Sequence, residues 1–108
     1  MIYTIEEITR LVLPVAEKHG LKAVYLFGSY ARGTATDASD VDLMIDTTGT
    51  GIKRLLQIAA VYCDLEEALG KPVDLITVSS LEQPARMPSE QRFRKTVWEE
   101  NVDIYVAA

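Results

Sequence analysis

The chain has 108 residues, of which 48% are apolar and 25% charged, and its formal net charge is −5 at pH 7. This length and composition predict one ordered domain over residues 1–108 and exclude a disordered chain. The negative charge argues against binding to long nucleic acid, because such binding depends largely on Lys and Arg displacing counterions from phosphates.

The first predicted element is a helix from Thr4 to His19. Thr4 and Glu7 form a capping box, in which two side chains satisfy backbone donors of the first helical turn. Apolar residues then recur at helical spacing. Pro14 lacks a backbone donor, so we expect a kink or a break there, and Gly20 is expected to cap the helix end.

Two strands and a second helix are expected next. Residues 22–27 and 41–45 are short apolar runs typical of strands, and the polar stretch 30–39 between them predicts an irregular loop. A helix over residues 55–69 ends at Gly70. Its core-facing stripe is predicted to consist of Leu55, Ile58, Ala59, Tyr62, Leu65 and Leu69.

The C-terminal part is predicted to contain a third strand over residues 73–78, a loop over 79–88 and a helix from Ser89 to about Asn101. The tail 102–106 fits either a short edge strand or an extension of that helix, and periodicity does not distinguish the two. The whole pattern predicts a small sheet with helices packed against it.

The single cysteine, Cys63, falls in a helical pattern and is expected to be a buried thiol without a chemical role. No apolar run approaches the roughly 18 residues of a membrane span, and the N-terminus does not have the pattern of a signal peptide. We therefore expect a cytoplasmic protein without a membrane partner.

Polar residues accompany all three predicted strands. Gly28 and Ser29 follow the first strand, where a residue without a side chain lets the backbone approach a ligand closely. Exposed backbone N–H groups and a hydroxyl are natural anion ligands, so this pair predicts a phosphate site.

Three aspartates complete this pattern. Asp40 and Asp42 are two residues apart, which places them on one face of the second strand, and Asp74 lies in the third strand, where an unpartnered carboxylate would be costly to bury. Their mutual repulsion would be relieved by Mg²⁺, which binds oxygen ligands together with substrate phosphates. Each aspartate alone could instead cap a turn or face water.

The combination is more informative than its parts. The Gly-Ser pair and the Asp-x-Asp motif at this spacing should arise in roughly one random chain of this length per thousand. The segments Gly28–Gly33, Ser39–Leu43 and Val73–Leu75 resemble the signature of the polymerase-beta-type nucleotidyltransferase superfamily. The most similar branch is the minimal nucleotidyltransferases, prokaryotic proteins that often serve as antitoxins beside a HEPN-domain toxin.

The resemblance extends over nearly the whole chain and implies an α+β nucleotidyltransferase fold with a mixed sheet. It implies that Asp40 and Asp42 bind two Mg²⁺ ions and that Asp74 binds the catalytic one. Gly28 and Ser29 would hold the triphosphate of ATP. Arg32 could contact the β- or γ-phosphate, or it could form an ion pair that stabilises the fold.

The function that the resemblance implies is transfer of AMP from ATP to a hydroxyl, with a tyrosine of a HEPN-family RNase toxin as acceptor. Two other functions stay open at this point: an antitoxin that acts by binding alone, and a nucleotidyltransferase for small molecules. The preference for ATP comes from the resemblance only.

Overall fold

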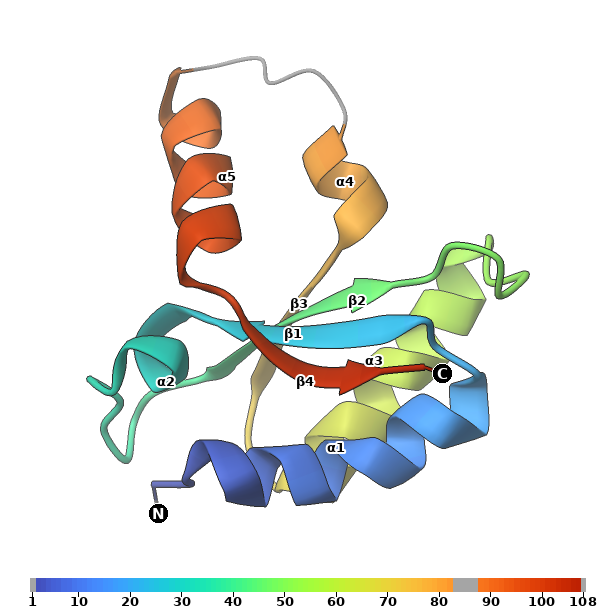
Figure 1. The fold of residues 1–108 in the computed structure, drawn as a ribbon. Helices are drawn as coiled ribbons and strands as arrows, with labels where there is room; N and C mark the ends of the chain where they lie inside the picture. The colour runs from blue at the N-terminus through green and yellow to red at the C-terminus, as the bar shows by residue number, and fades with distance from the viewer. Residues whose placement is uncertain (1, 83–87, 108) are drawn as a thin grey trace.

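The computed structural model of the chain describes residues 2–82 and 88–107. Helices and strands alternate along most of this part (Figure 1). In chain order they are α1 (Ile5–His19), β1 (Ala23–Phe27), α2 (Gly28–Arg32), β2 (Val41–Asp46), α3 (Leu55–Leu69), β3 (Val73–Thr77), α4 (Val78–Glu82), α5 (Pro88–Glu100) and β4 (Val102–Val106).

The described strands form one mixed sheet in the order β3-β2-β1-β4. β1 is antiparallel to both β2 and β4, and β3 is parallel to β2. The predicted α+β architecture with a mixed sheet is confirmed. The alternative left open for the tail is also decided, because residues 102–106 form the edge strand β4.

Helix α1 begins and ends as predicted. Thr4 and Glu7 form both capping-box hydrogen bonds, and Gly20 adopts the left-handed conformation at the C-cap. The expected break at Pro14 is wrong, since the helix continues through it. Pro14 lies on the exposed side, and the buried side packs along the whole length of the helix through Ile8, Val12, Val15 and Ala16. Packing of this face offsets the backbone hydrogen bond lost at proline.

The predicted apolar stripe of α3 is only partly correct. The buried residues of this helix are Val61, Leu65 and Leu69, whereas Leu55 is 82% exposed and Ala59 is also exposed. Ile58 and Tyr62 are partly buried and pack against the core as predicted, so the predicted stripe is wrong at Leu55 and Ala59.

Cys63 is exposed, contrary to the expected buried thiol. It lies two residues from both Val61 and Leu65, which puts it on the opposite side of α3 from these buried residues, because successive helical residues are about 100° apart.

Two short helices replace segments that were expected to be irregular or extended. α2 covers the start of the predicted loop 30–39, and α4 begins at Val78, which was expected to end the third strand. Each has five residues, too few to show helical periodicity in the sequence. Residues 83–87 of the expected loop 79–88 lie outside the described residues.

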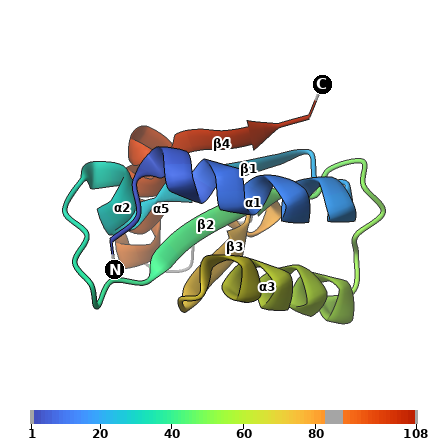
Figure 2. The same cartoon turned by 90° about the horizontal axis from the view of Figure 1, so that it is seen from below.

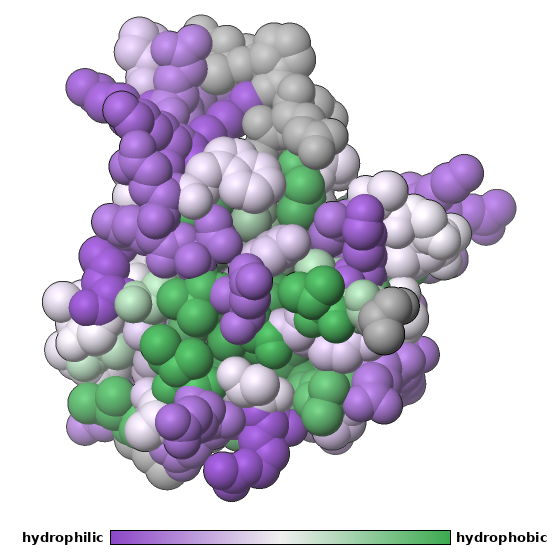
Figure 3. Space-filling view, in the orientation of Figure 1, coloured by the Kyte–Doolittle hydropathy of each residue, from purple (hydrophilic) through white to green (hydrophobic). Residues whose placement is uncertain are grey.

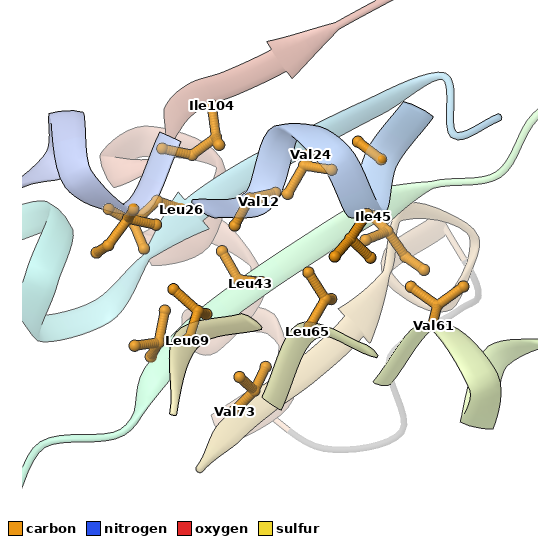
Figure 4. Close-up of a cluster of buried hydrophobic side chains, with 14 of the residues drawn as sticks. Val12, Val24, Leu26, Leu43, Ile45, Val61, Leu65, Leu69, Val73 and Ile104 are labelled. Carbon is orange, nitrogen blue, oxygen red and sulfur yellow. The ribbon is translucent and has the colours of Figure 1, made fainter. Parts of the chain in front are cut away.

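Helices cover both faces of the sheet. α1 and α3 lie together on one face, as the view from below shows (Figure 2). The larger hydrophobic core fills the space between them and the sheet (Figure 4). It includes Val12 from α1, Leu65 from α3 and Leu43 from β2.

The opposite face carries α4 and α5, which rise from the sheet in Figure 1. A smaller cluster of Phe27, Met44, Val78 and Val97 packs there. Figure 3 shows mostly hydrophilic side chains over α5 and hydrophobic ones around β4. Within residues 2–82 and 88–107, no helix has the length and apolar character needed to cross a membrane.

Candidate active site

Strand pairing brings the predicted site residues to one end of the sheet. Asp42 in β2 pairs with Asp74 in β3 and, on its other side, with Phe27 at the end of β1. Paired residues on neighbouring strands lie on the same face of a sheet. This is the face that carries α5, because Phe27 and Val97 belong to one cluster. Gly28 follows Phe27 directly, so the predicted phosphate turn lies beside these two carboxylates.

Gly28 permits the close approach of the chain to Asp42. Its φ is +73°, which side chains other than glycine rarely adopt, and a Cβ added here would lie 2.8 Å from Cγ of Asp42. Only glycine fits between β1 and this carboxylate. Ser29 follows in the first turn of α2 and is half-buried.

The surroundings of Asp42 disfavour the charged form of its carboxyl group. Its pKa is raised to about 6, first because burial disfavours the charged form and then because the negative charges of Asp74 and Asp40 lie close by, while Arg32 acts in the opposite direction. The raised pKa reflects a partly buried carboxylate that lies close to two others. A bound cation at this position would favour the charged form of Asp42.

Asp40 and Asp74 are both exposed. The reasoning that Asp74 would be a buried carboxylate in need of a partner is wrong, because β3 lies at the edge of the sheet. Asp42 and Asp74 line the same cleft, whereas Asp40 precedes β2 and acts on Asp42 through its charge.

The donor set suits magnesium bound together with a substrate. Among the described residues, no group of three or more His, Cys, Asp and Glu side chains is already gathered around a metal position. Mg²⁺ does not require such a cage, since it commonly binds one or two carboxylates and completes its shell with phosphate oxygens and water. The pair Asp42 and Asp74, with Asp40 within electrostatic range, fits that requirement.

Arg32 lies in the cleft, as the phosphate-binding alternative requires, and it also forms the ion pair of the other alternative. Its Nη1 donates to Oε2 of Glu100 at 3.1 Å, with 46% and 35% of the two side chains exposed. Such a partly exposed pair is weak enough for a phosphate to displace. Both readings of Arg32 therefore fit the geometry.

The cleft has a volume of about 270 Å³ and opens between the carboxylates and α5. One face of α5 forms its wall through Phe93, Thr96, Val97 and Glu100. Sequence reasoning missed these four residues. Their spacing of three, four and seven residues places them on one helix face. The sequence does not show that this face contacts the aspartates, because the two groups are far apart along the chain. A second cavity of about 290 Å³ lies between α1 and α3 and contains none of Asp40, Asp42 and Asp74.

Comparison with protein families gives a match to the nucleotidyltransferase domain over residues 8–104. MJ0435 of Methanocaldococcus jannaschii, a candidate protein adenylyltransferase, is 43% identical over 77 residues, which are 71% of this chain and 81% of the relative. The protein adenylyltransferase MntA of Thermococcus cleftensis is 38% identical over 82 residues, or 72% of this chain and 81% of the relative.

Solved structures share the fold. A candidate minimal nucleotidyltransferase superposes with a TM-score of 0.67 at 30% identity, over 93% of this chain and 95% of that one. A toxin–antitoxin structure with AMP-PNP gives a TM-score of 0.68 at 21% identity, over 92% of this chain and 73% of that one. A chain in the complex of tri-AMPylated Shewanella oneidensis HEPN toxin with MNT antitoxin gives 0.65 at 17% identity, over 96% and 74%.

Proposed function

Because the chain belongs to the nucleotidyltransferase domain family, among the minimal nucleotidyltransferases, we propose that it transfers AMP from ATP to a protein hydroxyl. The acceptor is a tyrosine of a HEPN-family RNase toxin, and its modification neutralises the toxin in the cytoplasm. Relatives named as protein adenylyltransferases support AMP as the transferred group. The structures with AMP-PNP and with a HEPN toxin support ATP as donor and the class of partner.

One observation carries the proposal. Gly28 lies against the Asp42 carboxylate, and Asp42 is paired with Asp74 at the mouth of a cleft. A phosphate-binding turn next to uncompensated carboxylates provides sites for a triphosphate and for the cations that neutralise it.

The proposed reaction is an in-line displacement. The acceptor oxygen bonds to the α-phosphorus of ATP, the bond from that phosphorus to the bridging oxygen of the β-phosphate breaks, and pyrophosphate leaves. Two Mg²⁺ ions bound by Asp40, Asp42 and Asp74 would stabilise the entering and departing oxygens. The hydroxyl proton passes to Asp74, which is exposed and therefore accessible to an acceptor on a partner protein.

Binding of the triphosphate is assigned to the turn after β1. Backbone N–H groups at Gly28 and Ser29, with the Ser29 hydroxyl, would hold phosphate oxygens. Arg32 would exchange Glu100 for a phosphate and add a charge-assisted hydrogen bond.

A protein acceptor also suits the size of the cleft. Small-molecule sites commonly enclose about 300 to 1,000 Å³, and this cleft has about 270 Å³. A nucleotide would leave little room for a second small substrate. A protein partner can instead present its hydroxyl from outside, and the net charge of −5 would favour a basic surface around that hydroxyl.

The test combines the purified chain with Mg²⁺, labelled ATP and the product of the neighbouring gene, which we expect to be a HEPN toxin. We expect label on the toxin, a mass increase of one or more AMP units on a tyrosine, and loss of its RNase activity. The double variant Asp40→Asn, Asp42→Asn should produce none of these.

The same experiment separates catalysis from neutralisation by binding. If the double variant silences the toxin as well as the wild-type chain does and neither forms an adduct, the chain is an antitoxin that acts by contact alone. Label on a small molecule in place of the toxin would indicate a different acceptor class.

A further inference from the structure

The wall that α5 contributes to the cleft contains an aromatic side chain that the proposed chemistry does not use. Phe93 lines the cleft together with Asp42 and Asp74, and 48% of it is exposed. Phosphates, hydrated metal ions and an acceptor hydroxyl are polar and give an exposed phenyl ring little apolar contact. A flat aromatic group, such as a nucleobase, would cover the ring.

The ring of Phe93 is supported by a second aromatic side chain. It packs against Phe27 in an edge-to-face arrangement, with centroids 6.2 Å apart and planes at 76°. Phe27 itself is 5% exposed and belongs to the cluster that anchors α5 through Val97. Aromatic pairs of this geometry are favourable, so Phe93 enters the cleft from a rigid support.

The position along the chain is also informative. Phe27 directly precedes Gly28, so the aromatic pair lies next to the turn that would hold the triphosphate. A nucleotide bound there has its base beyond the ribose and α-phosphate, on the side away from the leaving pyrophosphate. The aromatic wall and the phosphate turn line one cleft, so a single nucleotide could contact both.

Two polar side chains of the wall lie beside Phe93. The Thr96 hydroxyl donates to the backbone carbonyl of Arg92 at 3.0 Å. Glu100 pairs with Arg32, and its carboxylate becomes an acceptor once Arg32 binds a phosphate. Apart from that carboxylate, the wall offers a ligand mainly the aromatic surface of Phe93, which favours contact with the flat face of a base.

We infer that Phe93 is the platform on which the nucleobase of the bound nucleotide stacks, with Phe27 holding the platform in position. The inference rests on the proposed nucleotide site and adds a base subsite to it. Stacking of a base on an aromatic side chain is sequence-tolerant, because every base presents a π-face. Purines, with the larger face, gain most from it.

The test measures the affinity of the purified chain, with Mg²⁺, for AMP-PNP and for inorganic tripolyphosphate, which has no base. Phe93→Ala should weaken AMP-PNP binding on the order of tenfold or more and leave tripolyphosphate binding unchanged. Phe93→Tyr should retain the affinity for AMP-PNP, because it preserves the ring.

Trp98→Ala is the matched control. Trp98 lies on the same helix, is also 48% exposed, and is not among the residues that line the cleft. It should bind both ligands as the wild-type chain does. Circular dichroism on each variant checks that α5 is intact.

Two results would overturn the inference. Equal weakening of AMP-PNP and tripolyphosphate by Phe93→Ala would show that Phe93 supports the cleft as a whole. Unchanged binding of both would show that the base lies elsewhere. This binding test does not depend on AMP transfer. A chain that binds ATP but does not modify the toxin in the transfer assay would refute the proposed function and leave the base subsite intact.

Discussion

Replacing Gly28 by alanine perturbs the geometry of the site with a single methyl group. The added Cβ would lie 2.8 Å from Cγ of Asp42, whereas carbon atoms prefer separations of about 3.5 to 4.0 Å, so the carboxylate must move by about 1 Å. Misplacement on this scale costs roughly 10²-fold in rate when it affects a group that positions the substrate. We therefore expect AMP transfer to fall about 100-fold.

The same substitution also strains the backbone. Holding alanine at a φ of +73° costs about 1–2 kcal/mol, and in a domain of this size each kcal/mol lowers the Tm by roughly 4–8 °C. Gly70→Ala is the matched control, because Gly70 has a φ of +64° and nothing lies within 4 Å of its Cβ position. It should show a similar shift in Tm with near-normal activity.

The assay measures the initial rate of labelled AMP transfer at a temperature below the onset of unfolding. The Tm of each variant is measured separately. Equal activity in the two alanine variants would refute the reasoning, since it would mean that the approach of Gly28 to Asp42 has no part in the reaction.

Three further predictions concern charge and packing. Because the pKa of Asp42 in the folded chain is raised to about 6, the metal-free protein should lose stability as pH rises from 4 to 7. Asp42→Asn should abolish this part of the pH dependence in urea unfolding. An unchanged pH profile in the variant would contradict this prediction. Glu100→Gln should release Arg32 from its ion pair and tighten tripolyphosphate binding about two- to fivefold. Arg32→Gln should weaken tripolyphosphate binding. Weaker binding in Glu100→Gln would show that the ion pair organises the site. Leu65→Ala should cost about 2–5 kcal/mol in unfolding free energy, because Leu65 is fully buried. Leu55→Ala should change the unfolding free energy by less than about 0.5 kcal/mol, and comparable losses would mean that Leu55 is packed in solution.

The parts of the site that lie close in sequence were predictable. Gly28 and Ser29 follow β1, Asp40 directly precedes β2 and Asp42 is the second residue of β2, so the predicted strands alone place these four residues. That Asp74 shares a metal site with Asp40 and Asp42 was inferred from the cost of burying a lone carboxylate at Asp74. Asp42 and Asp74 do pair, but that reason was incorrect, since Asp74 is exposed on an edge strand.

The parts that depend on strand order and helix placement were not predictable. Nothing in the pattern of residues 73–78 shows that β3 lies at the sheet edge, and nothing in residues 88–100 shows that α5 leans over the aspartates. Leu55 fits a helical stripe as well as Leu65 does, but only the packed structure distinguishes the apolar residue that has a partner element from the one that does not.

The exposure of Cys63 has a practical consequence for all of these measurements. It is the single cysteine of the chain, and it lies on α3, which packs on the face of the sheet opposite to α5. A maleimide fluorophore attached there would report on toxin association or unfolding without entering the cleft. The same thiol could join two copies through an intermolecular disulfide during storage, so a reducing agent or prior labelling belongs in every preparation.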